Sequence, residues 1–386
     1  MGSAPSRIGG SSRRRWKWLA GTAVLVLAIL TLFYLRYDLR AYAVLTHFAN
    51  PETPGILLGW ETRSISRLES SLALRNHSIP SILYSPQGVA HPRGMLLIHG
   101  LHHLGIHDPR ITNLARALAE DGFAVLTPQF GALADYHVDG TTIPEIGESA
   151  QWLEQQLRSG PVTVIGISFG GGLALLAAAE PQYEGSVRAI VSFGGYDDLE
   201  RVCRFLATRE EEFPDGSVVP LAAHDYGGAI LVYDNLDRFF PAGDVPAARE
   251  ALRRYLWEKP QTAKPWLEKL SPAGRATMDN LFARQIAPLR PQLLASIQAD
   301  QDKMASLSPH GKIAGLRVPV FILHGSTDNI IPPAESLWLA REVPQKDLRG
   351  LLITSVFTHV DMKDGASLLG ELRLVHFLAE VLRAAD

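Results

Sequence analysis

The chain has 386 residues, 46% of them hydrophobic, so it can bury a large core as one big domain or as a domain with an insertion. Its formal net charge of −3 gives no sign of a nucleic-acid partner. The single cysteine, Cys203, excludes an intramolecular disulfide and a cysteine metal cluster, but it says nothing about the compartment.

The N-terminus combines a basic tail, residues 1–17, with an apolar run, residues 18–35. The run contains no charged residue and comes close to the roughly 20 residues that span a bilayer. The tail is more basic than the flank after the run, so the positive-inside rule predicts a single-pass membrane protein with a cytoplasmic N-terminus and the rest of the chain outside. Residues 36–65 would form a short helix and a juxtamembrane linker. A cleaved signal peptide and a buried core helix are the alternatives.

The chain after residue 65 alternates between predicted strands and helices. Two alternating runs, residues 67–74 and 78–85, predict an antiparallel pair. Continuous apolar runs predict buried strands at residues 94–99, 123–128, 162–167, 186–194, 318–324 and 350–356. Amphipathic or strongly helical runs predict helices at residues 111–119, 143–158, 173–179, 333–342 and 366–384. This order predicts an α/β fold whose mostly parallel sheet is covered by helices on both faces.

Residues 196–315 interrupt the alternation and separate two parts of the core, residues 66–195 and 316–386. The interruption predicts a helical insertion with helices at residues 199–210, 246–257, 264–270 and 278–304 and a loop at residues 213–219. Its aromatic side chains either form a simple core or wall an apolar substrate pocket as a cap.

The sequence Gly166-Ile167-Ser168-Phe169-Gly170 stands between a predicted strand and a predicted helix. Strand, sharp turn and helix are the context of a G-x-S-x-G nucleophile elbow, in which the tight turn exposes a serine hydroxyl near a helix N-terminus. An ordinary glycine-rich turn is the alternative.

Four motifs give the chain a resemblance to the serine esterases and lipases of the α/β-hydrolase fold. They are His99-Gly100-Leu101, Gly166–Gly170, the run from His324 to Asp328, and Thr358-His359-Val360-Asp361. The resemblance implies Ser168 as nucleophile, His359 as base and Asp328 as the acid that orients the histidine. Asp197 and Asp198 are alternative acids, because some relatives carry the acid one strand earlier, and Asp361 is a weaker one.

The resemblance also implies an oxyanion hole made by the backbone N–H groups of Phe169 and Leu101, with His102 as the alternative for the second donor. The chain has His-Gly-Leu-His-His here, not the His-Gly-Gly-Gly of some lipases. Five clustered side chains could suggest a metal site, but their spacing matches no ligand pattern: His99, His102, His103, His107 and Asp108.

These observations predict a membrane-anchored serine hydrolase that cleaves a small-molecule ester with an apolar group. The chemistry needs neither a metal nor an organic cofactor, and the membrane partner would be bound through residues 18–35. The same three side chains would serve an acyltransferase, a thioesterase or a peptidase. The alternative of another class is a catalytically silent, hydrolase-like binding module.

Overall fold

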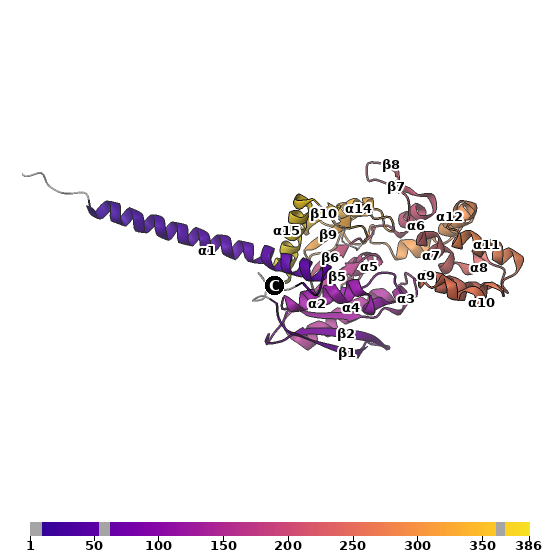
Figure 1. Ribbon diagram of the computed structural model, residues 1–386, viewed down its shortest axis with the longest axis horizontal. Coiled ribbons are helices and arrows are strands. Elements are labelled where there is room, and N and C mark those ends of the chain that lie inside the picture. The colour runs from indigo at the N-terminus through magenta and orange to yellow at the C-terminus, as the bar shows by residue number, and fades with distance from the viewer. Residues whose placement is uncertain (1–9, 54–61, 360–366) are drawn as a thin grey trace, which may run out of the picture.

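The computed structural model describes residues 10–53, 62–359 and 367–386. Its centre is an eight-stranded sheet in the order β1-β2-β4-β3-β5-β6-β9-β10 (Figure 1). The strands are β1 (Ile65–Ala73), β2 (Ser78–Pro86), β3 (Gly94–Ile98), β4 (Ala124–Pro128), β5 (Val162–Ile167), β6 (Val187–Phe193), β9 (Val320–Gly325) and β10 (Leu348–Thr354). Strand β2 is antiparallel to β1 and β4, and the other neighbours are parallel, so the predicted mostly parallel sheet with an antiparallel edge is confirmed.

Helices cover both faces of the sheet, because successive side chains of the buried strands point to opposite sides. In β3, Met95 and Leu97 pack in the layer under α2 (Pro109–Glu120) and α15 (Leu368–Ala385). Leu96 and Ile98 face the opposite layer. That layer contains α4 (Thr142–Leu157), α5 (Phe169–Ala179) and α14 (Ala334–Glu342). A short helix, α3 (Gly131–Ala134), and two 3₁₀ turns, Gly105–His107 and Glu184–Ser186, complete the core.

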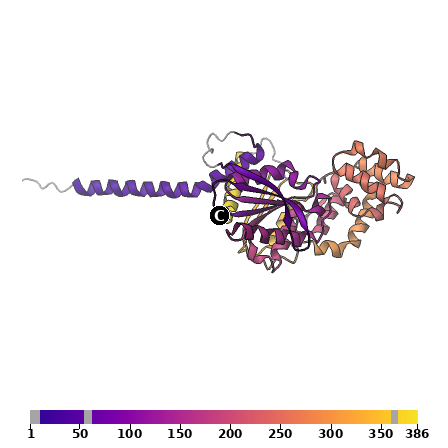
Figure 2. The same ribbon diagram turned by 90° about the horizontal axis from the view of Figure 1, so that it is seen from below.

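Helix α1 (Gly10–Ala49) extends away from the body of the protein as a long rod (Figures 1 and 2). It contains the predicted membrane-spanning segment, residues 18–35, of which the side chains at 27–30 and 32–34 lie outside the described part. Trp18, Leu19 and Val24 are more than half exposed. Of the helices that the structure describes, none is long and apolar enough to cross a membrane, so the predicted anchor has no support from the structure.

The C-terminal end of α1 packs on the core as part of it. Tyr37, Ala41 and Val44 are buried in the layer that contains α2 and α15. Arg40 binds both carboxylate oxygens of Asp121, at 2.9 and 2.8 Å, and the side chain of Asp386, at 2.6 Å. The structure therefore differs from the short helix and linker predicted for residues 36–65. Residues 36–49 continue α1, and residues 54–61 lie outside the described part.

The insertion folds into a separate helical layer at the end of the molecule opposite α1 (Figures 1 and 2). Its elements are α6 (Leu199–Thr208), β7 (Glu210–Glu212), β8 (Val218–Pro220), α7 (Tyr226–Asp234), α8 (Leu236–Phe239), α9 (Val245–Leu256), α10 (Lys264–Leu267), α11 (Pro272–Phe282), α12 (Arg290–Ala299) and α13 (Gln301–Ser306), with 3₁₀ turns at Pro260–Thr262 and Ala287–Leu289. Its buried apolar side chains form one cluster that reaches Tyr136 and Phe169 of the core.

One prediction inside the insertion is wrong. Residues 278–304 are not one helix: α11, α12 and α13 share this stretch. Arg284 has a positive φ of 60°, and Pro288 and Pro291 cannot donate the hydrogen bonds that would continue the helix. The predicted loop at residues 213–219 is confirmed for residues 213–217, which form the turn of a hairpin between β7 and β8, whereas Val218 and Val219 belong to β8.

Candidate active site

The turn after β5 holds Ser168 in a strained conformation, with φ 54° and ψ −130°. Glycine is required on both sides of the turn because other backbone atoms come very close. A Cβ on Gly170 would lie 2.8 Å from Ile98 Cγ2 and 2.9 Å from the His99 carbonyl oxygen, and one on Gly166 would lie 2.7 Å from the backbone of Gly171. The predicted strand–turn–helix context of Ser168 is therefore present.

Ser168, His359 and Asp328 form one hydrogen-bonded chain. The Nε2 atom of His359 lies 2.8 Å from Ser168 Oγ, and its Nδ1 atom is bonded to Asp328 Oδ2. An ionised carboxylate can only accept, so Nδ1 carries the proton and Nε2 is free to accept the serine hydroxyl. Residues 168, 328 and 359 follow three different strands, β5, β9 and β10, and the parallel sheet brings their loops to the same edge.

Asp328 is fully buried and well supplied with hydrogen bonds. Its Oδ1 atom accepts the backbone N–H groups of Ile330 and Ile331, at 2.9 and 3.1 Å. Burial alone would raise the pKa of Asp328. The positive charge of a protonated His359 and hydrogen bonds from His324 and His359 outweigh burial and hold this pKa well below its usual range. The carboxylate therefore stays ionised at neutral pH.

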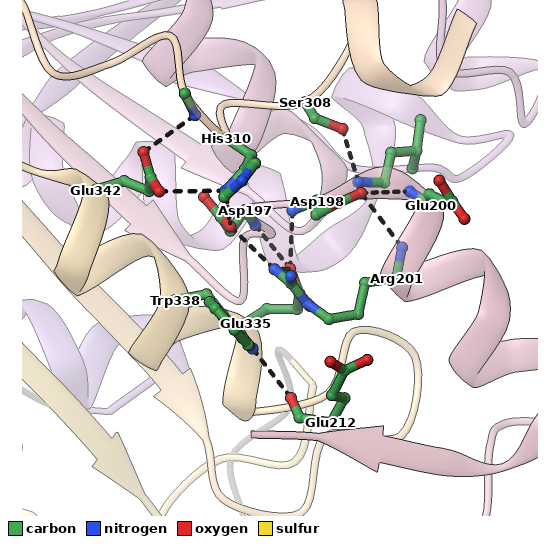
Figure 3. A network of polar contacts seen from close by, with 12 residues as sticks. Asp197, Asp198, Glu200, Arg201, Glu212, Ser308, His310, Glu335, Trp338 and Glu342 are labelled. Atoms are coloured by element: carbon green, nitrogen blue, oxygen red, sulfur yellow. Dashed lines mark hydrogen bonds and ion pairs between the residues drawn. The ribbon is translucent and has the colours of Figure 1, made fainter. Parts of the chain in front are cut away.

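The alternative acids point elsewhere. Asp197 is bonded through Oδ2 to Arg201 at 2.9 Å and to His310 at 3.2 Å (Figure 3). Asp198 caps α6 by accepting the N–H groups of Glu200 and Arg201. Neither carboxylate bonds to His359 among the described residues, and the structure thus brings Asp328 to the histidine. Asp361 lies outside the described residues.

The loop after β3 is anchored by His99, which is fully buried. Its Nε2 accepts the N–H of Phe130 at 3.1 Å, so the neutral ring carries its proton on Nδ1, which donates to the Gly100 carbonyl at 2.8 Å. Burial, the main cause, lowers the pKa of His99 to about 4. In a trans peptide the next N–H, that of Leu101, points away from the Gly100 carbonyl.

Gly100 packs directly on the serine: a Cβ there would lie 2.8 Å from Ser168 Cβ. Phe169 begins α5, so its N–H is one of the helix N-terminal donors that lack an intrahelical partner. The predicted donors Leu101 and Phe169 therefore flank Ser168. The side chain of His102, the alternative, is held by Asp108 at 3.1 Å.

A cavity of about 440 Å³ opens over Ser168 and His359. The core contributes Leu101, Ile111 and Phe169 to its wall, and the insertion contributes Leu206 and Ile230. Polar groups line another part of the wall: Asp108, Arg110, Tyr136, His224, Tyr226 and Glu258. The insertion therefore covers the serine as a cap.

The clustered histidines of the loop after β3 do not gather as metal ligands within the described ranges, where such a group of three forms only at Asp197, His310 and Glu342. The rings of His102 and His103 pack against each other at a tilt, with centroids 4.8 Å apart, and burial lowers the pKa of each. His103 also stacks on Trp257 of the cap.

A family model described as the alpha/beta hydrolase fold matches residues 95–203, from β3 through the serine turn to α6. Together with the strand order and the three loops at one edge, this match decides the fold. The protein has the α/β-hydrolase fold. A search of curated proteins with this sequence found no match.

Solved structures resemble this hydrolase fold distantly. The acylaminoacyl peptidase of Pyrococcus horikoshii, in an orthorhombic crystal form, is 11% identical with a TM-score of 0.49, covering 86% of this chain and 43% of its own. An esterase of Pyrococcus furiosus is 12% identical with a TM-score of 0.45, covering 83% of this chain and 91% of its own. The 2,6-dihydroxy-pseudo-oxynicotine hydrolase is 17% identical with a TM-score of 0.46, and the match covers 83% of this chain and 69% of that protein's chain. This chain therefore spans less than half the length of the peptidase.

Sequence reasoning missed His324 as a neighbour of the site. It is fully buried, and its Nε2 lies 2.9 Å from the Ile331 carbonyl and 3.3 Å from Asp328 Oδ2, while its Nδ1 lies 2.6 Å from Ser336 Oγ. The available signal was a histidine at the end of an apolar strand, four residues before the candidate acid. His324 helps to position Asp328 and does not reach Ser168.

Proposed function

We propose that the protein is a serine hydrolase that cleaves a carboxylic ester through an acyl-enzyme. The observation that carries the proposal is the hydrogen-bonded chain from Ser168 through His359 to the buried, ionised Asp328. A serine hydroxyl is a weak nucleophile until a base takes its proton, and this arrangement supplies the base and the group that orients it.

In the first step, Ser168 Oγ attacks the ester carbonyl carbon while its proton passes to His359 Nε2. Collapse of the tetrahedral intermediate breaks the bond to the alcohol, which leaves with that proton and yields the acyl-enzyme. Water then attacks the acyl carbon, again losing a proton to His359. The proton returns to Ser168 Oγ as the carboxylic acid departs.

The intermediate carries a negative oxygen that needs fixed donors. The N–H groups of Phe169 and Leu101 are the proposed donors, and the hydrogen bond from His99 to the Gly100 carbonyl supports Leu101 over His102 because it fixes the peptide plane. Removal of one such donor costs roughly 100- to 1,000-fold in kcat in other enzymes.

The substrate is proposed to be a small ester with an apolar acyl or alcohol group. Apolar side chains of both core and cap line the cavity next to Ser168, and its volume of about 440 Å³ lies in the range of small-molecule sites. Membrane attachment through residues 18–35, with the hydrolase outside the cytoplasm, stays a prediction from the sequence.

Labelling with a fluorophosphonate probe tests the nucleophile. The wild type should label rapidly, Ser168→Ala should not label, and His359→Ala and Asp328→Ala should label slowly because the hydroxyl is no longer activated. Ser326→Ala is a matched control, since this exposed serine lies two residues from Asp328 and should leave labelling unchanged. Equal labelling of Ser168→Ala and wild type would overturn the proposal.

Product analysis then separates the reactions that the same three residues can perform. In turnover assays with a series of esters, thioesters and peptides, the protein should cleave the esters fastest. Addition of competing alcohols should leave the free acid as the main product, whereas accumulation of a new ester would indicate an acyltransferase. A folded wild type that neither labels nor turns over any substrate would favour the silent binding module.

A further inference from the structure

Three side chains that do not line the cavity over Ser168 converge where the cap joins the core. Asp197 follows β6 at the start of the cap, His310 lies on the segment that returns from the cap, and Glu342 is the last residue of α14. Their donor atoms all lie within 4.8 Å of one another, and the side chains face each other in Figure 3. The chain thus brings one imidazole and two carboxylates to one point.

The distances fit a small metal ion as well as they fit hydrogen bonds. The Nδ1 atom of His310 lies 3.2 Å from Asp197 Oδ2 and 3.2 Å from Glu342 Oε1. This nitrogen carries at most one proton, so it can donate to only one of the two oxygens. In tetrahedral zinc sites, bonds of about 2.0 Å place neighbouring ligand atoms about 3.3 Å apart.

Asp197 provides a second, independent observation. Its side chain is fully buried, and its Oδ1 atom, which is shielded from water, accepts no hydrogen bond from any residue that the structure describes. Buried carboxylate oxygens are costly without a partner, so this atom lacks a cation or a donor. Figure 3 shows the Asp197 carboxylate turned toward His310 and Glu342.

The surroundings position the ligands and leave excess negative charge. Arg201 binds Glu335 at 2.5 and 3.2 Å as well as Asp197, and Glu335 also accepts the N–H of Asp197. Glu342 is oriented through its other oxygen, which accepts the N–H of Gly311 at 3.0 Å. Asp197 and Glu335 share the Arg201 guanidinium, and Glu342 adds a third carboxylate next to His310, so these groups carry an excess of two negative charges when His310 is neutral. A divalent cation would balance these two negative charges.

We propose that Asp197, His310 and Glu342 bind a zinc ion that fastens both connections of the cap to α14. Two carboxylates and one imidazole suit zinc, whereas calcium and magnesium prefer oxygen ligands alone. The His310 side chain is half exposed, which leaves an access path and a fourth position for water. The role is structural and independent of the proposed ester chemistry, because the ion would lie outside the cavity over Ser168.

Metal binding by the full-length protein tests the proposal. After treatment with EDTA and removal of the chelator, titration calorimetry with zinc chloride should show one ion per chain, and the melting temperature should rise with zinc. Cobalt(II) should give the intense visible absorption of a tetrahedral site. His310→Ala and Glu342→Gln should each weaken zinc binding at least 100-fold, beyond the 10- to 100-fold typical of losing a mere supporting contact.

His77→Ala is the matched control, because His77 is equally half exposed and lies 2.8 Å from a single carboxylate, that of Glu145. It should bind zinc like the wild type. Circular dichroism of each variant shows whether it is folded. The proposal is overturned if the folded wild type binds no stoichiometric zinc, or if His310→Ala and Glu342→Gln bind it as tightly as His77→Ala does. His310 would then be an ordinary hydrogen-bonded side chain.

Discussion

Acid should destabilise this protein through His99, whose ring anchors the loop beside Ser168. The pKa of His99 is lowered by burial to about 4, against an unfolded value near 6.5. Above pH 6.5 the ring is neutral in both states. Between pH 6.5 and 4 the unfolded chain takes up a proton that the folded chain does not, so the free energy of unfolding falls as the pH falls.

The size of the effect follows from the shift. For one group with these two pKa values, lowering the pH from 7.5 to 4.5 removes about 2.5 kcal/mol of stability. His99→Asn removes the titration. The asparagine amide can still donate to the Gly100 carbonyl, but the N–H of Phe130 loses its acceptor, which should cost roughly 1–3 kcal/mol at pH 7.5.

Urea unfolding of wild type and His99→Asn at pH 7.5, 6.5, 5.5 and 4.5 provides the assay. The variant should be less stable at pH 7.5, and the difference should shrink by about 2.5 kcal/mol at pH 4.5, so that the two proteins become similar or change order. His91→Asn, at an exposed histidine, should follow the wild type at every pH. A difference between wild type and His99→Asn that stays constant with pH would refute the reasoning.

Three further predictions concern the site and the N-terminus. Asp328→Asn should lower kcat/KM for an ester by about 10⁴-fold, because a neutral amide does not hold His359 in the required tautomer or stabilise its protonated form; the pKa of Asp328 lies well below its usual range, so the wild-type carboxylate stays ionised from pH 8 to 5, and an unchanged kcat/KM in the variant would contradict its role. Gly170→Ala should abolish fluorophosphonate labelling and destabilise the fold by roughly 1–3 kcal/mol, whereas Gly131→Ala should do neither, because in the described part of the chain nothing beyond its own helix and chain neighbours lies within 4 Å of the added Cβ. Deletion of residues 1–35 should move the protein from the carbonate-washed membrane fraction to the supernatant without loss of labelling, and a full-length protein found only in the supernatant would exclude the anchor.

Local sequence patterns were sufficient to predict the strands of the sheet and the turn at Ser168. Buried parallel strands are continuous apolar runs, and the runs from residue 94 to 356 predicted every strand of the parallel part. The Gly-x-Ser-x-Gly turn is equally local, because its glycines are required by contacts within a few residues of the serine and with the adjacent strand. The bounds of the cap helices were harder to predict from the sequence, because tertiary contacts there outweigh a weak local pattern.

The choice among carboxylates needed the tertiary structure. Asp197, Asp198 and Asp328 all follow predicted strands, and nothing in their local sequence tells which one meets His359. Packing decides: Arg201 and His310 engage Asp197, Asp198 caps its own helix, and the loop after β9 turns Asp328 toward the histidine. The contacts of Asp197 with Arg201 and of Asp198 with its own helix are local, but His310 lies more than a hundred residues from Asp197, and the meeting of Asp328 with His359 depends on which loops share an edge.

By itself, the sequence determined the order of strands and helices in the core and the position of the serine turn, because each depends on hydrophobic periodicity or on backbone sterics over a few residues. Only the tertiary structure decided that the end of α1 belongs to the core, that Asp328 meets His359, and that both ends of the cap meet at Asp197 and His310. Those contacts join residues distant in the chain, and their energies come from burial, charge and hydrogen bonds that exist only once the layers have packed.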